Sequence, residues 1–138
     1  MPTEKQITLV KKSWSLLMNV DPVLLGDVFY RKLFIDDPSV KSMFHAERSE
    51  QAKKLVDMLS MIILRLHKLD TIEAEIVSLA KRHVGYGTTP KHYDEVGSAL
   101  LWTLQQALRD EWNEELEEAW KACYGHLAGV MIAATKEA

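Results

Sequence analysis

The amino-acid sequence predicts an all-α protein with one domain over residues 1–138. Apolar residues recur every three or four positions in several long segments, which is the period of one helix face. The chain has only six Gly and four Pro, few for a protein built from many short strands and turns. No run alternates between apolar and polar residues for long enough to predict a strand.

The first two helices have recognisable start signals. Thr3 and Gln6 have the spacing of a capping box, and an apolar face follows them. Asp21–Pro22 combines a capping residue with a proline suited to the first helical turn, and the helix it opens runs to about Phe34. The sequence DDP at 36–38 then ends that helix.

Four more helices are expected after a turn-rich stretch that reaches about Arg48. Ser49 is the predicted cap of a long helix with a broad apolar face. A shorter helix carries His83 and ends at the Gly85–Pro90 loop. The last two are expected over residues 93–108 and 113–134, and we expect about seven helices in the whole chain.

Composition excludes several classes of function. The net charge of −3 and the pI near 5.9 come without the basic stripe that a nucleic-acid phosphate backbone requires. No apolar run approaches the roughly 20 residues of a membrane-spanning helix, and the polar start contains no secretory signal. A single cysteine, Cys123, leaves no internal disulfide. We therefore expect a cytoplasmic protein without nucleic-acid or membrane partners.

A metal-ligand candidate lies on the apolar face of the shorter helix. His83 stands four residues after Leu79, so its ring projects into the interior. The alternative is a core histidine whose ring bonds a carbonyl. Gln51, Leu55 and Met58 share one face of the preceding long helix, and Tyr30 lies one helix earlier. This pattern suits a flat apolar cofactor with a metal, although it also fits core polar groups that satisfy one another.

Longer sequence motifs point to one particular protein family. The sequence resembles the globin family, in particular bacterial single-domain haemoglobins and the haem domain of flavohaemoglobins. Pro38 and Phe44 stand six apart, as the corner proline and haem-stacking phenylalanine of that family do. The matching segments are FYRKLF at 29–34, DPSVKSMF at 37–44, Gln51 with Leu55, RH at 82–83, HYDEVG at 92–97, LL at 100–101, TL at 103–104 and EAWKACY at 118–124.

The resemblance implies a three-over-three helical sandwich around haem b, the iron protoporphyrin IX, with His83 as the iron ligand. Its haem would lie between Leu55 and His83, with a carbonyl such as that of Leu79 bonding the second ring nitrogen of His83. The implied cofactor contacts are Phe44 on the macrocycle, Leu79, Tyr86 and Val96 on the proximal side, and Lys54 and Arg82 at the propionates. Lys54 and Arg82 are equally consistent with solvated surface charges.

The same resemblance places Tyr30 and Gln51 on the distal side, where they would donate hydrogen bonds to dioxygen. Two donors at about 1.5 kcal/mol each contribute roughly 3 kcal/mol and slow ligand release by about a hundredfold. The alternative for Tyr30 is a core tyrosine bonded to a carbonyl. Gly26 and Ala52 predict a close crossing of the two helices that carry these donors, the alternative being a tolerated surface glycine.

One position departs from the flavohaemoglobin pattern. Tyr93 matches the tyrosine that acts with a glutamate to polarise the proximal histidine, but Thr135 occupies the glutamate position. Glu137 lies about 200° further around the helix and is not a simple substitute. With no flavin or nicotinamide domain in the sequence, we do not expect efficient peroxidase-like or self-contained reductive chemistry.

Other metal sites are poorly supported. Cys123 and His126 form a Cys-x-x-His pair, but no second pair of zinc ligands is evident. The chain has no Glu-x-x-His motif, which argues against a di-iron carboxylate bundle. His45, His67 and His92 are interpreted as surface or loop residues.

These expectations leave three hypotheses. The first is a haem protein that binds dioxygen with high affinity and slow release, and that also binds nitric oxide and carbon monoxide. The second is a nitric oxide dioxygenase that works with a separate reductase. The third is a sensor read by a partner. The sequence does not decide between the first two; we favour oxygen binding, with dioxygenase activity as a serious alternative. The sequence leaves oxygen affinity, oligomeric state, iron coordination at rest and the physiological partner undetermined.

Overall fold

The computed structural model describes residues 2–43, 47–85 and 88–136, and these residues are almost entirely helical. The α-helices are α1 (Glu4–Leu17), α2 (Pro22–Asp36), α3 (Arg48–Leu64), α4 (Glu73–Gly85), α5 (Pro90–Leu108) and α6 (Glu114–Lys136). Short 3₁₀ helices cover Pro38–Met43, Leu66–Ile72 and Arg109–Glu111. The described ranges hold no strand, so the all-α prediction is confirmed. The count of about seven helices corresponds to six α-helices and these shorter turns.

Most helix starts follow from local capping. The Thr3 side chain accepts from the Gln6 amide at 3.1 Å and the Gln6 side chain accepts from the Thr3 amide at 2.9 Å, so the predicted capping box is present. Asp21 caps α2, as predicted. Helix α3 begins at Arg48 with Glu47 in the cap position, two residues before the predicted cap Ser49. Ser49 instead donates from its hydroxyl to the Glu47 carboxylate.

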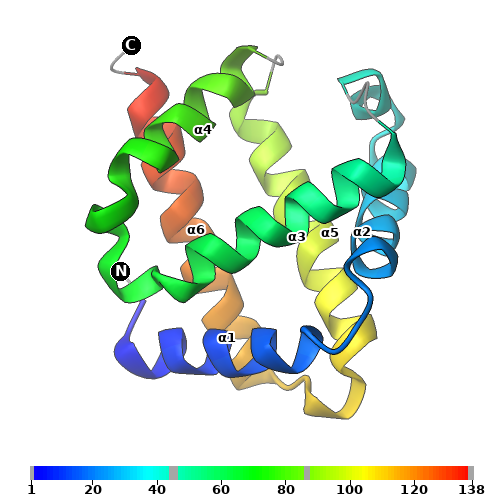
Figure 1. Cartoon of the computed structure of the whole chain (residues 1–138), viewed down its shortest axis with the longest axis vertical. Coiled ribbons are helices and arrows are strands. Elements are labelled where there is room, and N and C mark those ends of the chain that lie inside the picture. Colours follow the sequence, from blue (N-terminus) through cyan, green and yellow to red (C-terminus); the bar gives the residue numbers. More distant parts are fainter. Residues whose placement is uncertain (1, 44–46, 86–87, 137–138) are drawn as a thin grey trace.

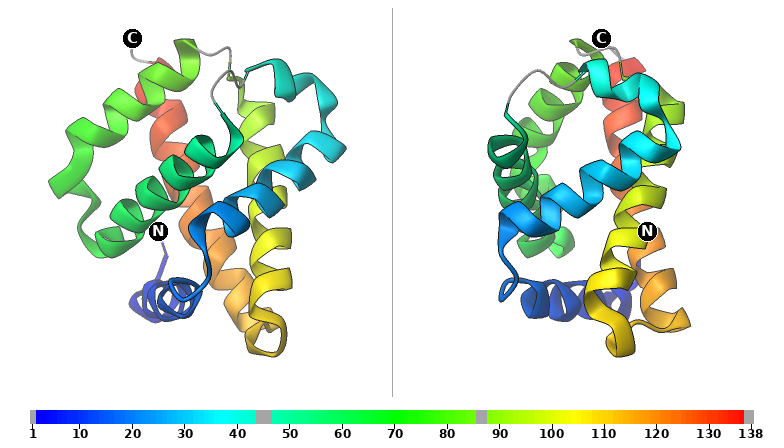
Figure 2. Two further views of the ribbon diagram at one scale, coloured as in Figure 1. Left: turned by 45° about the vertical axis from the view of Figure 1, so that its right-hand side comes forward. Right: turned by 90° about the vertical axis from the view of Figure 1, so that its right-hand side faces the viewer.

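The helices pack in two groups. Helix α2 packs on α3 and α5, whereas α1 and α4 pack on α6. Figure 1 shows α5 and α6 side by side, with α3 crossing them and α1 closing the lower end. In the right-hand view of Figure 2, α3 and α5 lie on opposite sides of the molecule, and α2 runs from one toward the other. No helix in the described ranges is long and apolar enough to cross a membrane.

The crossing of α2 over α3 requires a residue without a side chain. A Cβ placed on Gly26 would lie 2.6 Å from the Cα of Ala52, far inside normal contact. Gly26 is buried and Ala52 is fully buried. This confirms the predicted close approach, and it excludes the alternative of a surface glycine.

Two tryptophans join α1 to the rest of the core. The rings of Trp14 and Trp120 are both buried, with centroids 6.0 Å apart. The Trp14 indole N–H donates to the hydroxyl of Ser60 at 2.9 Å, and the Trp120 indole N–H donates to that of Ser13 at 3.0 Å. These bonds connect α1 to α3 and to α6 because each buried indole needs an acceptor.

Candidate cofactor pocket

An inner cavity of about 100 Å³ lies between α3, α4, α5 and α6. Four rings on its wall carry polar atoms, those of His83, His92, Tyr93 and Tyr124. The other described residues on the wall are Phe29, Leu55, Met58, Leu59, Ile62, Leu79, Val96, Leu100, Leu127, Ala128 and Met131. Cofactor sites share this composition, a largely apolar wall with a few polar groups.

A groove between α3 and α4 adjoins the inner cavity. Its volume is about 430 Å³, and Met58, Ile62 and Leu79 line both spaces. Pockets that enclose a drug-sized ligand measure about 300–1,000 Å³. The inner cavity alone therefore accommodates only part of a macrocycle, and the α3–α4 groove extends the apolar space beside it.

His83 is held in one tautomer by its own helix. Its Nδ1 lies 2.8 Å from the carbonyl oxygen of Leu79, one turn earlier, as predicted. A carbonyl only accepts, so Nδ1 carries the proton and the lone pair of the neutral ring is on Nε2. A hydrogen bond of this kind, from the other ring nitrogen, orients a metal-ligating histidine. A half-buried imidazole in this tautomer on an apolar wall has the chemistry that an axial haem ligand requires.

Tyr93 supports the His83 ring from α5. The two rings are stacked, with centroids 6.3 Å apart and an interplanar angle of 21°. The Tyr124 hydroxyl donates to the Tyr93 carbonyl at 2.5 Å. A Cβ on Gly97 would lie 2.7 Å from the Tyr124 ring, so only glycine leaves room for that ring. Burial raises the pKa of both phenols, which therefore remain protonated and neutral at physiological pH.

The position that aligns with a glutamate in flavohaemoglobins carries no charge. The hydroxyl of Thr135 donates to the carbonyl of Ile132 at 2.7 Å, within α6. Glu137 lies outside the described residues. The neighbours of His83 described above are thus a carbonyl and a neutral phenol, which polarise the imidazole less than a carboxylate does.

The predicted distal donors lie away from the wall of the inner cavity. Tyr30 is 5% exposed and packs edge-on against Phe29, which is on that wall, and against the face of Phe34. Burial raises the pKa of Tyr30 to about 12, so its hydroxyl keeps its proton. Gln51 is partly exposed in the first turn of α3. Contact of Tyr30 or Gln51 with a ligand stays a prediction.

The other predicted contact residues separate into three groups. Leu55, Leu79 and Val96 line the inner cavity. Lys54 is 72% exposed and lies 3.8 Å from the Glu50 carboxylate, which favours the surface-charge alternative for it. Phe44 and Tyr86 lie outside the described residues, as does His45.

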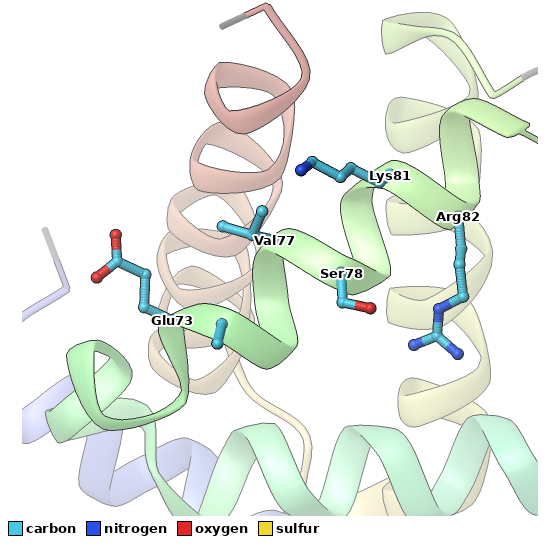
Figure 3. Close-up of a pocket in the computed structure, with 6 residues that line it drawn as sticks. Glu73, Val77, Ser78, Lys81 and Arg82 are labelled. Atoms are coloured by element: carbon cyan, nitrogen blue, oxygen red, sulfur yellow. The ribbon is translucent and has the colours of Figure 1, made fainter. Parts of the chain in front are cut away.

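Arg82 belongs to the outer surface of the molecule. It lies at the edge of the α3–α4 groove and of a shallow, solvent-open depression along α4. Figure 3 shows Glu73, Val77, Ser78, Lys81 and Arg82 along that depression, with the charged side chains extending in different directions. The depression exceeds the inner cavity in volume, but these charges do not converge on one point and form no site.

His92 is a cavity residue that the sequence interpretation missed. It lies on the wall of the inner cavity, and its Nδ1 accepts from the Thr89 amide at 2.9 Å. Helix α5 consequently begins at Pro90, three residues before the predicted start at Tyr93. The signal was a capping-box spacing with histidine in the place of the usual Glu or Gln.

In the part of the chain that the structure describes, Cys123 is not accompanied by further side chains that could complete a metal site. It is buried in the core, and burial raises its pKa to about 11, so it remains a neutral thiol. Among the described residues no group of three or more His, Cys, Asp or Glu side chains is placed to hold a metal ion.

Comparison with known proteins gives consistent matches. The Globin family model matches residues 27–131. A Vibrio cholerae flavohemoprotein is 30% identical over 96% of this chain, and the match covers 34% of its own length. The chain thus spans about one third of that relative. An anaerobic nitrite reductase from Gossypium hirsutum is 30% identical over 94% of this chain and 88% of its own.

A solved structure confirms the predicted architecture. A bacterial globin from Campylobacter jejuni superposes with a TM-score of 0.86 at 30% identity. The match covers 98% of this chain and 97% of the other. The three-over-three arrangement that the motifs implied is therefore correct.

Proposed function

This chain belongs to the globin family, a family of haem proteins, and from that membership we propose that it captures dioxygen on a haem b ligated by His83. The inner cavity and the adjoining α3–α4 groove receive the macrocycle. When bound, haem supplies an iron that binds small gaseous ligands. The protein supplies the axial nitrogen, the apolar surroundings and the distal hydrogen-bond donors.

The observation that carries the proposal is the Nδ1–H donation from His83 to Leu79 at 2.8 Å. It fixes the lone pair on Nε2 and limits rotation of the ring, so the axial nitrogen is presented without reorganisation. Tyr93 stacks on this ring and restricts it further. Tyr124 and Gly97 in turn hold the start of α5 against α6.

Tyr30 and Gln51 select the ligand in this proposal. The phenol of Tyr30, with its pKa raised to about 12, remains a donor over the whole physiological range. A bound dioxygen carrying partial negative charge would be stabilised by the hydrogen bonds that Tyr30 and Gln51 donate, whereas carbon monoxide would be stabilised far less. With about 1.5 kcal/mol from each of two donors, dioxygen release slows by roughly a hundredfold. This predicts high affinity, suited to scavenging more than to delivery.

The test is haem uptake followed by ligand kinetics. The purified chain titrated with haem should bind one equivalent and give a mainly five-coordinate ferrous spectrum, because the Gln51 amide is a poor iron ligand. Stopped-flow displacement of dioxygen by carbon monoxide should then show slow oxygen release. A chain that takes up no haem contradicts the proposal as a whole, and rapid oxygen release contradicts its high-affinity part.

A second function, nitric oxide dioxygenase, is favoured by the similarity to flavohemoproteins. The same pocket would bring dioxygen and nitric oxide together to form nitrate. Turnover then requires electrons from a separate reductase, because ferric haem must be reduced after each cycle. Nitric oxide consumption over many turnovers, measured with and without an added reductase, tests it. Consumption limited to one equivalent per haem even with the reductase contradicts it.

A further inference from the structure

His92 is a polar group on the wall of the inner cavity that the proposed dioxygen binding does not use. The backbone amide of Thr89 lies 2.9 Å from its Nδ1, and the Thr89 hydroxyl lies 3.3 Å from the same atom. A backbone amide can only donate, so Nδ1 carries no proton. The neutral ring must hold its proton on Nε2, at the opposite side of the ring from the start of α5.

The two histidines on the wall of this cavity therefore differ in the chemistry of Nε2. The bond to Leu79 makes His83 Nε2 a lone-pair donor suited to a metal. The bond from Thr89 makes His92 Nε2 a hydrogen-bond donor suited to an anion. A haem carries both kinds of partner, an iron at its centre and two propionate carboxylates at one edge.

We propose that His92 donates from Nε2–H to a haem propionate, so that one residue both caps α5 and anchors the cofactor. This inference rests on the proposed haem binding. His92 occupies the third position of α5, a 19-residue helix, where the partial positive charge of the helix start stabilises an anion. Glu95 lies one turn further on, but Lys91 is 3.6 Å from its carboxylate and offsets its charge.

The residues predicted for the propionates are less well placed than His92. Lys54 is largely exposed and paired with Glu50. Arg82 lies on the outer surface beside the α3–α4 groove and is not on the wall of the inner cavity. Since His92 is already ordered by Thr89, its donor is held in place before the cofactor binds, which lowers the entropic cost of the contact.

Two substitutions separate the capping role from the anchoring role. His92→Gln keeps an acceptor for the Thr89 amide and a donor for the propionate. His92→Glu restores the usual capping-box residue but removes the donor and adds a charge that repels a carboxylate. Thermal unfolding of the apoproteins should show that both variants fold like the unmodified chain. Haem transfer to an excess of an apoglobin acceptor measures cofactor loss.

We expect His92→Glu to lose haem roughly tenfold faster than the unmodified protein, and His92→Gln to stay within about threefold of it. Haem dimethyl ester, whose propionates are esterified, provides the decisive control. With the ester, the difference between the Glu and Gln variants should largely disappear. His67→Gln, at an exposed histidine outside the cavity, should leave haem loss unchanged.

Two results would overturn the role of His92 while leaving haem binding intact. One is equal haem loss from the Glu variant and the unmodified chain, which would leave His92 with the capping role alone. The other is a Glu-to-Gln difference that persists with the dimethyl ester, which would place the effect elsewhere than at the propionate. Failure of the unmodified chain to take up haem would overturn the proposed function together with this inference.

Discussion

The wall of the inner cavity built by α4 and α5 differs from the side formed by α2 and α3 in how its polar groups are fixed. On the first side, His83 is bonded to a carbonyl one turn earlier in its own helix. His92 is bonded to the amide three residues before it. On the second side, Tyr30 is buried between aromatic rings, and its position relative to Gln51 depends on the crossing at Gly26 and Ala52.

The difference is between a side chain positioned by its own helix and one positioned by the packing of two helices. The His83 side chain bonds a carbonyl one turn earlier in its own helix, so this bond depends little on how other helices pack, and the tautomer tolerates small shifts in packing. The distance from Tyr30 to Gln51 instead follows from how closely two helices approach. We therefore expect substitutions on the α4–α5 side to act on cofactor retention, and those on the α2–α3 side to act on stability and ligand kinetics.

The largest effect is expected at His83. His83→Ala removes the proposed iron ligand, and haem retention should weaken by more than roughly a hundredfold, because loss of a hydrogen bond that merely orients such a ligand already costs about 10–100-fold in metal affinity. The variant should remain helical by circular dichroism. Haem content after gel filtration measures the loss, with His67→Ala as a control at an exposed histidine. Full haem content with an unchanged visible spectrum would exclude His83 as the ligand.

The crossing of α2 over α3 should be sensitive to a single methyl group. Gly26→Ala places a Cβ 2.6 Å from the Cα of Ala52, so the helices must separate. We expect the free energy of unfolding to fall by about 1–3 kcal/mol, despite the better helix propensity of alanine.

Gly129 provides the matched control for this substitution. It is an exposed glycine of α6, and a Cβ there would meet nothing within 4 Å. Gly129→Ala should gain about 0.5–1 kcal/mol. Urea unfolding of both variants measures the difference. Equal effects at the two positions would show that the crossing adapts to the added methyl group.

The Tyr30 hydroxyl should slow the release of dioxygen more than the release of carbon monoxide. Tyr30→Phe keeps the ring that packs against Phe29 and Phe34, so the packing loss is small. Dioxygen release should accelerate about tenfold, while carbon monoxide release changes far less. Flash photolysis and ligand displacement measure both rates. Equal acceleration for the two gases would mean that the substitution acts through access or packing.

The smallest effect concerns a carboxyl pair beside the cavity. A hydrogen bond with Asp37 and burial raise the pKa of Glu95, a shift that Lys91 and His92 oppose, whereas hydrogen bonds with Glu95 and Ser39 lower the pKa of Asp37. One Glu95 oxygen, Oε2, is buried without a hydrogen-bond partner among the described residues. A raised pKa means that the protonated form is favoured on folding. The associated stability is complete at low pH and is lost as pH rises through the folded pKa of Glu95.

Glu95→Gln should remove this loss, because the amide donates to Asp37 at every pH. We compare the difference in melting temperature between the variant and the unmodified chain at two pH values. This difference should be about 2 °C more favourable to the variant at about pH 8 than at about pH 5. Glu50→Gln, at an exposed carboxylate paired with Lys54, serves as the control. A difference that does not change with pH would indicate that the two carboxyl groups share no proton.

Features set within a few residues were predictable from the sequence. The Thr3–Gln6 capping box and the bond from His83 to Leu79 follow from spacing along one helix. The close approach of Gly26 and Ala52 was also predictable, because a glycine inside a helix costs stability unless packing requires it. The apolar face of α3 likewise indicated that Leu55 would be directed inward.

Features that depend on an unusual residue or on tertiary packing were missed. Histidine is an uncommon partner in a capping box, so the start of α5 was placed too late and His92 was interpreted as a surface residue. The stacking of Tyr93 on His83 joins two helices across the cavity, and no single-helix pattern encodes it. The proposed roles of Phe44 and Tyr86 lie outside the described residues, and those of Lys54 and Arg82 depend on long side chains that can turn toward solvent.

The buried indole pair of Trp14 and Trp120 has an optical consequence. Porphyrins absorb where indoles emit, so a haem bound among α3–α6, as proposed, would take up excitation energy from this pair and weaken its emission. Trp102, 38% exposed on α5 with the Lys32 ammonium 5.4 Å from its ring, senses solvent as well. The fluorescence of Trp14 and Trp120, at the junction of α1 and α6, would therefore rise when the cofactor is lost. It serves as an intrinsic probe of whether the protein holds haem.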